Sequence, residues 1–350
     1  MKSIIVGEKC IGTDNAPFIV AEMSANHNKS LERALSIVEA AAEAGADAIK
    51  LQTYTSDRMT LNLNKKEFYI NNADSLWNGK SLYELYQDAY TPREWHKVIF
   101  EKCNDLGLIC FSSPLDYTDV DFLEEIGMPL YKVGGFDNID LPLIRYLSET
   151  GKPIMVSTGM ATLGELYDIV NTALESGCKD LVLLKCTSTY PALPRNANLL
   201  TIPHMKEMFD VHVGLSDHTL GNGVAIASVA LGATVIEKHF TLSRMDSGPD
   251  SKFSIEPGEL KTLVKETKKA WQSLGMIHYG PTDEEKEYLK YRRSLYVTMD
   301  MKPGDIFTKE NLKAIRPGYG LPIKYYNIFL GKKVNEEVAK GTPLNWDMIG

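Results

Sequence analysis

Two histidines and a glutamate occupy positions from which they could bind a metal ion. Glu237 and His239 follow a short apolar run at residues 235–236, and His218 follows another run that begins at Gly214. Residues two apart on a strand point to the same side, so Glu237 and His239 would share one face. Two imidazoles and a carboxylate can hold a divalent cation with coordination positions left open. The competing interpretation is that each histidine is a hydrogen-bonded residue of the core.

Three lysines, Lys50, Lys132 and Lys185, also lie in or at the ends of short apolar runs. A lysine in a buried strand costs free energy unless its ammonium group meets an anion, although one at a strand end can extend to solvent. Polar residues stand at the ends of neighbouring runs, among them Glu22, Gln52, Ser113, Ser157, Ser188 and Ser216. Three lysines with hydroxyl groups between them indicate a site for a phosphate group.

A lysine inside a strand also suits an aldolase that forms a Schiff base, with Lys132 or Lys185 as the nucleophile. The paired histidines argue against this alternative, because Schiff-base chemistry needs no metal. Cys186 stands beside Lys185, and the sequence does not decide which of the two points inward. A small buried thiol is the preferred interpretation of Cys186.

The elements that carry these residues alternate between strand and helix. Strand-like apolar runs, separated by helical patterns, cover residues 18–23, 48–53, 108–113, 130–135, 153–159, 181–188, 211–217 and 235–240. Eight strand-and-helix units in about 260 residues have the size of a (β/α)8, or TIM, barrel, which places its chemistry at the C-terminal strand ends. A doubly wound sheet is disfavoured because no glycine-rich turn follows the first run and no P-loop occurs.

The pattern changes after Gly280-Pro281-Thr282, where we expect a second domain to begin. Residues 283–291 predict a charged helix, and short apolar runs punctuated by Gly and Pro follow it. The segment 302–312 is echoed at 340–349, with a Gly turn and apolar residues at matching positions. We therefore divide the chain into a barrel domain, residues 1–280, and a small domain, residues 281–350, whose core would be marginal alone.

The composition of the chain indicates which kinds of partner and which cellular compartment to expect. A formal net charge of −8, with no basic run longer than a pair, argues against nucleic acid, so any anionic substrate must be met by local lysines. The apolar core of residues 1–8 is too short to predict a signal peptide, and no apolar run of about 18 residues predicts a membrane span. The five cysteines form no CxxC pair. They indicate reduced thiols and a cytoplasmic protein.

With these residues identified, the chain resembles the sialic acid synthase family, whose members condense phosphoenolpyruvate with an amino sugar. The matching motifs occur in order at residues 21–27, 45–53, 157–160, 214–219 and 237–240. The C-terminal segment, including Arg316-Pro317-Gly318-Tyr319-Gly320, resembles that family's antifreeze-like (SAF) domain, a fold of the β-clip type. The resemblance covers essentially the whole chain.

The resemblance implies a role for each of these residues. His218 and His239 would hold Mn2+ or Mg2+, with Glu22 and Glu237 completing the catalytic set, and Lys50, Lys132, Lys185, Ser113 and Ser157 would receive phosphoenolpyruvate. Positions matched to the N-acyl amino sugar are Glu22, Gln52, Tyr190 and Asp250, and Ser188 is a further expected substrate contact. Arg316 would come from a partner chain, which implies a homodimer with exchanged C-terminal domains.

Motif variants and the long connection from Tyr54 to Thr91 resemble the branch whose acceptor is 2,4-diacetamido-2,4,6-trideoxy-L-altrose. Three aromatic residues of that connection, Trp77, Tyr83 and Tyr86, are expected to line the acceptor's apolar end. The branches that make legionaminic or N-acetylneuraminic acid remain alternatives, as does a non-catalytic sugar-binding protein. One departure concerns phosphate binding: this chain has Gly135 and Asp137 where the family carries Ser and Glu.

Overall fold

The computed structural model describes residues 1–73, 75–246 and 248–349. The chain separates into two compact units, Met1–Gly275 and Met276–Gly350. The sequence placed the domain boundary a few residues later, after residue 280. Each unit is described by itself below.

The first unit is built on a closed barrel of eight parallel strands within the described residues. Neighbouring strands follow chain order, and the last pairs with the first, with Val235 opposite Phe18 and His239 opposite Glu22. The strands are β3 (Phe18–Glu22), β4 (Ala48–Thr53), β5 (Ile109–Pro114), β6 (Tyr131–Val133), β7 (Ile154–Ser157), β8 (Leu181–Cys186), β9 (His212–Asp217) and β10 (Val235–His239). The predicted TIM barrel is confirmed.

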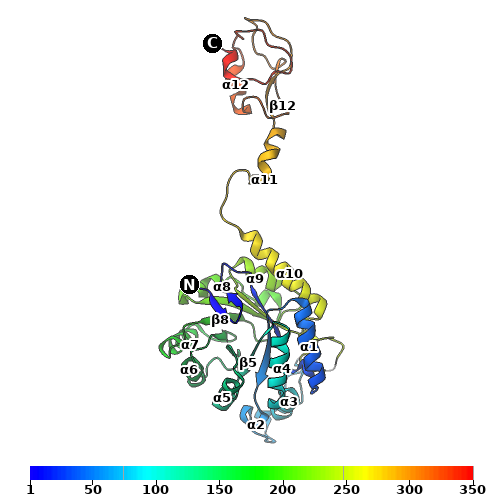
Figure 1. The fold of residues 1–350 in the computed structure, drawn as a ribbon, viewed down its shortest axis with the longest axis vertical. Helices are drawn as coiled ribbons and strands as arrows, with labels where there is room; N and C mark the ends of the chain where they lie inside the picture. The colour runs from blue at the N-terminus through cyan, green and yellow to red at the C-terminus, as the bar shows by residue number, and fades with distance from the viewer. Residues whose placement is uncertain (74, 247, 350) are drawn as a thin grey trace. The chain divides into compact units, whose positions relative to one another are not determined.

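Helices form a ring around these strands (Figure 1). The ring comprises α1 (Leu31–Ala44), α4 (Arg93–Asp105), α5 (Tyr117–Ile126), α6 (Leu141–Glu149), α7 (Leu163–Glu175), α8 (Thr201–Phe209), α9 (Gly223–Ala230) and α10 (Pro257–Leu274). Local sequence sets their ends. The Ser30 side chain accepts a hydrogen bond from the Arg33 backbone at the start of α1, and Gly45 ends the helix at a φ of 86°.

The barrel has two apolar layers. Strand residues that face outward pack on the helices, whereas those that face inward form a separate core inside the barrel, with Val20, Phe111, Met155 and Leu184 among its members. An N-terminal hairpin of β1 (Ile4–Val6) and β2 (Lys9–Ile11) contributes to this inner core. The sequence analysis did not identify that hairpin.

The inner face of each strand changes from apolar to polar toward the C-terminal end. On β3 the inward residues are Phe18 and Val20, followed by Glu22, which pairs with the lining residue Lys50, and on β10 Val235 is followed by Glu237. Side chains two residues apart on a strand share a face, so one alternation builds both the inner core and a polar floor above it.

A long connection between β4 and α4 carries two further helices, α2 (Ser56–Met59) and α3 (Leu82–Ala89), and a short 3-10 helix, Lys66–Phe68. A capping box between Ser81 and Glu84 begins α3. The Trp77 indole N–H donates to the Pro249 carbonyl oxygen at 3.1 Å, which joins this connection to the segment after β10.

The second unit contains α11 (Asp283–Lys286), a 3-10 helix (Glu287–Tyr291), the antiparallel strands β11 (Ser294–Val297) and β12 (Leu312–Ile315), and α12 (Tyr326–Phe329). Its own small core contains apolar residues from both echoed segments, among them Phe307, Leu312 and Leu344. The charged helix expected at 283–291 is therefore split between an α-helical and a 3-10 turn.

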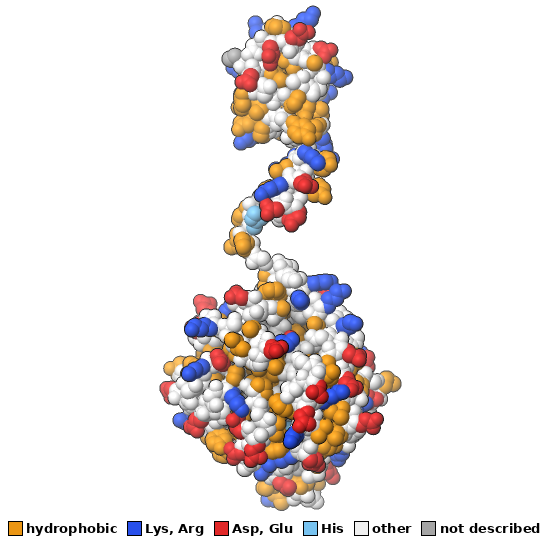
Figure 2. All heavy atoms as spheres, viewed as in Figure 1, with side chains coloured by type: hydrophobic (Ala, Val, Ile, Leu, Met, Phe, Trp, Pro, Cys, Tyr) orange, Lys and Arg blue, Asp and Glu red, His pale blue; other side chains and the backbone are white. Residues whose placement is uncertain are grey.

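Figure 2 shows acidic and basic side chains interspersed over the visible face of the barrel unit, without a broad field of one sign. Among the described residues, no helix combines the length and apolar character needed to cross a bilayer.

Candidate active site

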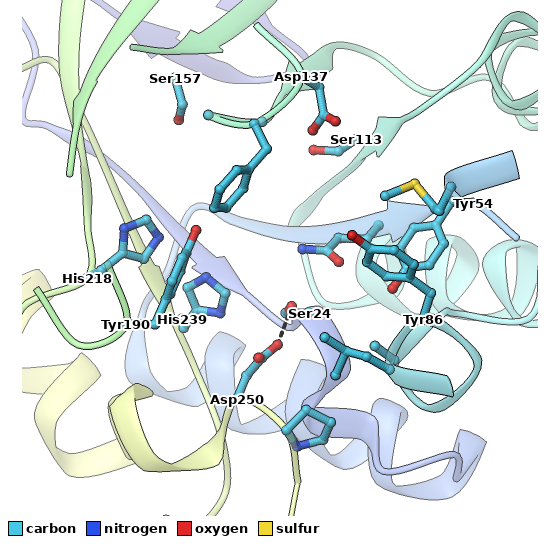
Figure 3. Close-up of a pocket in the computed structure, with 18 of the residues that line it drawn as sticks. Ser24, Tyr54, Tyr86, Ser113, Asp137, Ser157, Tyr190, His218, His239 and Asp250 are labelled. Carbon is cyan, nitrogen blue, oxygen red and sulfur yellow. Dashed lines mark hydrogen bonds between the residues drawn. The ribbon is translucent and has the colours of Figure 1, made fainter. Parts of the chain in front are cut away.

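A cavity of about 780 Å3 lies where the C-terminal strand ends of the barrel meet (Figure 3). Its floor is polar and is supplied by inward residues of the strands: Lys50, Gln52, Ser113, Lys132, Ser157, Ser216, His218, Glu237 and His239. Its wall is largely apolar and draws on the long connection: Tyr54, Met59, Ile70, Trp77, Leu82, Leu85 and Tyr86. The cavity therefore joins a charged end to an apolar end.

Two carboxylates and two ammonium groups are buried together at the floor; Lys50, Lys132 and Glu237 line the cavity, whereas Glu22 is buried beside Lys50 and is not among the lining residues. Lys50 Nζ lies 2.6 Å from Glu22 Oε2 and 4.0 Å from Glu237 Oε2, while Lys132 Nζ lies 3.8 Å from Glu237 Oε1. Gln52 Nε2 donates to Glu22 at 3.3 Å. Since the four charges balance within the cavity, each can be buried without an unpaired ion.

The two carboxyls differ in proton affinity. Burial raises the pKa of Glu22 to about 7, and the Glu237 charge adds to this, although Lys50 opposes it. Burial also acts on Glu237, but Lys132, Lys50 and a hydrogen bond from Ser216 outweigh it and lower its pKa. Because their pKa values are shifted in opposite directions, the two carboxyls can have different roles: Glu22 can exchange a proton near neutral pH, whereas Glu237 stays ionised.

The Lys132 ammonium is positioned to receive an anion. Its Nζ donates to Ser157 Oγ at 2.8 Å and to the Val133 carbonyl at 3.0 Å. Ser113 lines the same cavity, and its buried hydroxyl oxygen has no hydrogen-bond partner in the described chain. Ammonium groups and unengaged hydroxyls on one floor are the groups that bind phosphate or carboxylate oxygens.

The two imidazoles lie together under Tyr190. The ring centroids of His218 and His239 are 5.3 Å apart, and that of Tyr190 is 4.4 Å from His218. His218 Nδ1 lies 3.0 Å from the Thr187 carbonyl oxygen, whereas the buried Nδ1 of His239 has no partner within the described chain. Burial and nearby cations lower the pKa of His239 well below its usual range, which keeps this imidazole neutral.

These properties fit a metal site with two protein ligands. A neutral imidazole with an orphaned nitrogen can coordinate a cation, and a backbone carbonyl beside the other ring can orient it. Across residues 1–73, 75–246 and 248–349, no group of three His, Cys, Asp or Glu side chains converges on one metal position. In this structure Glu237 faces Lys132 and Ser216, and a third ligand from its carboxylate stays a prediction.

Strand parity resolves the choice between Lys185 and Cys186. Leu184 and Cys186 face inward, and Cys186 lines the cavity. Lys185 lies on the other face of β8, is not among the lining residues, and donates from Nζ to the Cys186 carbonyl at 3.0 Å. The structure thus separates Lys185 from the other two predicted lysines.

The Ser188 side chain lies against Gly135. A Cβ atom on Gly135 would lie 2.7 Å from the Ser188 hydroxyl oxygen, and one on Gly159 would overlap the same atom. The Ser188 hydroxyl therefore fills the space beside Gly135 in which a serine side chain would start. Asp137 lines the cavity, and burial raises its pKa.

The remaining predicted residues divide between the two units. Tyr190 and Asp250 line the cavity, as do Trp77 and Tyr86 of the long connection. Tyr83 is not among the lining residues, and its hydroxyl donates to Asp57 at 3.0 Å. Arg316 directly follows β12 in the second unit, where it is exposed.

The sequence analysis missed three lining residues that strand parity could have identified. Ser24, Tyr54 and Leu115 each lie two residues beyond a predicted floor residue, on the same alternation. Extending the alternation of inward and outward side chains by two residues past Glu22, Gln52 and Ser113 would have placed them in the cavity. Phe136 had no such signal, because it lies in a turn.

Comparisons with known proteins agree with this geometry. The model of the NeuB family matches residues 37–279, and that of the SAF domain matches residues 292–350. Pseudaminic acid synthases of Campylobacter jejuni and Helicobacter pylori are 46% and 42% identical over 335 residues, 95% of this chain and 96% and 98% of theirs. An N,N'-diacetyllegionaminic acid synthase of C. jejuni is 36% identical, over 90% of this chain and 94% of its own.

A solved N-acetylneuraminic acid synthetase of Leptospira borgpetersenii superposes with a TM-score of 0.73 at 30% identity. The match covers 82% of this chain and 95% of that one. The family resemblance that the motifs indicated is confirmed, as is the SAF domain.

The electrostatics of the floor predict how Glu22 titrates. Replacing Lys50 with Met should raise the Glu22 pKa further above about 7, because the Lys50 ammonium favours the ionised carboxyl. Infrared titration of protein labelled with 13C-glutamate, with Glu22→Gln as the reference for assignment, measures this midpoint. Lys185→Met is the matched control and should leave the midpoint in place. A Glu22 midpoint near pH 4.5 in the unsubstituted protein would contradict the assignment.

Proposed function

Because this chain belongs to the NeuB family, we propose that it joins phosphoenolpyruvate to 2,4-diacetamido-2,4,6-trideoxy-L-altrose and releases pseudaminic acid and phosphate. The observation that carries the proposal is the division of one cavity into a floor with two buried ammonium groups and an apolar wall. Phosphoenolpyruvate is a small polyanion, and the acceptor is a sugar with a methyl group and two acetamido groups. Each end of the cavity suits one substrate.

Phosphoenolpyruvate would bind on the floor. Lys50 and Lys132 supply the positive charge, and Ser113 and Ser157 supply hydroxyl donors. A substrate with several negative charges would be repelled by two ionised carboxylates. Because the pKa of Glu22 is about 7, this group can take up a proton as the anion enters, which leaves Lys50 free to pair with the substrate.

In the proposed reaction, carbon 3 of phosphoenolpyruvate attacks the aldehyde carbon of the open-chain sugar and forms the new C–C bond. Water adds at carbon 2 of the resulting oxocarbenium ion, and the C–O bond to phosphate breaks. Glu22, protonated as the anion enters and ordered by Gln52, donates its proton to the aldehyde oxygen as the C–C bond forms. The ionised Glu22 then accepts the proton from the water as a general base. Glu237 stays ionised and balances the positive charge that develops on the substrate.

His218 and His239 would hold a divalent cation, Mn2+ or Mg2+. When bound, such a cation acts as a Lewis acid on the aldehyde oxygen. The Tyr190 ring covers both imidazoles and packs on Phe253, so it limits the access of water to this part of the cavity. Asp250 and Gln52 supply acceptor and donor groups for the sugar.

We further propose a homodimer in which the SAF domain of one chain serves the barrel of the other. Exposed apolar residues follow five consecutive strands, β6 to β10, and therefore surround the mouth: Phe136, Met160, Leu193, Leu220 and Met245. A rim of this kind favours a covering partner. In this arrangement residues 1–280 form the synthase domain and residues 281–350 form the SAF domain. The SAF domain of one chain would bring its Arg316 to the substrate in the barrel of the other.

The five cysteines carry no disulfide. Unpaired thiols of this number suit a reducing compartment, so we propose a cytoplasmic location.

Phosphate release tests the proposed reaction. Wild-type protein is incubated with phosphoenolpyruvate and either the altrose-derived acceptor or N-acetylmannosamine, with and without EDTA, and phosphate is measured. We expect metal-dependent release with the altrose derivative only. Release only with N-acetylmannosamine would overturn the substrate, and a protein trapped by borohydride but inactive in this assay would restore the Schiff-base alternative.

Two tyrosines of α3 test the apolar wall. Tyr86 lines the cavity and packs against Tyr54 at 5.9 Å between ring centroids, whereas Tyr83 points away from it. Tyr86→Ala should raise the KM for the acceptor about tenfold, because about 1.4 kcal/mol of sugar contact is lost. The KM for phosphoenolpyruvate should stay within about twofold. Tyr83→Ala is the control, and equal effects of the two substitutions would contradict the assignment.

Mixed dimers test the exchanged domain. Arg316→Ala and His239→Ala proteins should each be inactive as homodimers. Co-expressed with different affinity tags and purified as heterodimers, they should regain up to half of the wild-type activity, since one site then combines an intact barrel with an intact Arg316. Heterodimers without activity would show that Arg316 does not act on the partner's barrel.

A further inference from the structure

Ser24 adopts a backbone conformation that is unusual for its residue type. It lies two residues beyond the end of β3, at the start of the 3-10 helix Ser24–His27, is buried with 4% of its surface exposed, and has a φ of 46°. This is the left-handed region, which costs free energy for any residue with a Cβ atom and is normally given to glycine. Strain of this kind persists where the side chain has a specific task.

The Ser24 hydroxyl contacts a single group, the carboxylate of Asp250. Its Oγ donates to Asp250 Oδ2 at 2.6 Å, and the backbone N–H of Ala25 donates to the same oxygen at 3.3 Å. Within the described chain, no donor reaches the second oxygen, Oδ1. Both residues line the cavity, and Figure 3 shows their hydrogen bond between the His239 imidazole and the Tyr86 ring.

Other contacts hold the backbone around Asp250. Ser254 Oγ donates to the Asp250 carbonyl at 2.7 Å and accepts from Asn26 Nδ2 at 2.9 Å. The Trp77 indole donates to the neighbouring Pro249 carbonyl at 3.1 Å. The loop is thus fixed without Ser24, and the Ser24 hydroxyl acts on the carboxylate group alone.

We propose that Ser24 is a positioning residue that orients the Asp250 carboxylate toward the acceptor sugar. By occupying Oδ2, the hydroxyl directs Oδ1 into the cavity. An ionised carboxylate only accepts hydrogen bonds, so its partner on the substrate is an O–H or an amide N–H. The inference rests on the proposed function, because it takes the acceptor to be an N-acyl amino sugar.

Replacing Ser24 with Gly separates positioning from folding. Glycine removes the hydroxyl and also relieves the strain at a φ of 46°, so the melting temperature should stay the same or rise. The KM for the acceptor should nevertheless rise about tenfold, while the KM for phosphoenolpyruvate stays within about twofold. A purely structural serine would not give this combination.

A double-mutant cycle shows whether Ser24 acts through Asp250. Ser24→Gly should have little further effect on the acceptor KM once Asp250 is replaced by Asn, because the oriented carboxylate is then already lost. Ser24→Ala, which also lacks the hydroxyl, should raise the acceptor KM as Ser24→Gly does. Ser148→Ala is the control, since that buried hydroxyl bonds only to the Ile144 carbonyl within α6.

The experiments distinguish failure of the positioning role of Ser24 from failure of the proposed function. Wild-type protein that releases phosphate with the altrose-derived acceptor, together with an unchanged acceptor KM in Ser24→Gly, overturns the positioning role alone. Additive effects of Ser24→Gly and Asp250→Asn overturn it as well. Wild-type protein without activity on any N-acyl amino sugar overturns the proposed function, and the positioning role with it.

Discussion

The structure depends on the burial of opposite charges at one end of a barrel. Lys50 and Lys132 can lie in the floor only because Glu22 and Glu237 lie within 4.0 Å of them. Removing one member of such a buried set leaves an uncompensated ion, at a cost of about 3–5 kcal/mol. The closed barrel brings these groups together, since β3, β4, β6 and β10 each contribute one of them and would be separated in an open sheet. A buried, charge-balanced floor is also an environment in which an anion can replace an internal carboxylate as the partner of a lysine.

Much of this arrangement could be predicted because alternate side chains along a β-strand point to the same face. Once Glu22, Lys50 and Glu237 are placed at strand ends, alternation puts them on the inner face, and the barrel brings them together. The sequence could not choose between Lys185 and Cys186, because the end of that strand offered no unambiguous inward residue. Tyr83 and Tyr86 were equivalent in sequence, since both lie in one short helix whose orientation is set by tertiary contacts. The strained φ of Ser24 also left no local signal, because its compensating partner, Asp250, is 226 residues away.

The cavity is built from two kinds of structural element, barrel strands and a long loop, which differ in how readily their sequence can change. Its floor consists mainly of strand residues whose backbones are fixed by the ladder on both sides, so the polar groups there are held by the whole barrel. Its apolar wall comes mainly from the connection between β4 and α4, which is tied to the barrel by contacts such as that between Trp77 and Pro249. A family with this division can change its sugar acceptor by altering a loop while it keeps the charged floor.

The pair formed by Gly135 and Ser188 shows why a departure from a motif has to be interpreted in three dimensions. Along the sequence, Gly135 removes a hydroxyl from the end of β6. In space, the hydroxyl of Ser188 occupies the adjoining volume, and a side chain on residue 135 would have to displace it. The two positions are therefore coupled: a serine at 135 and the present Ser188 rotamer exclude each other. The end of β8 thus occupies, through the Ser188 hydroxyl, the volume beside Gly135 at the end of β6.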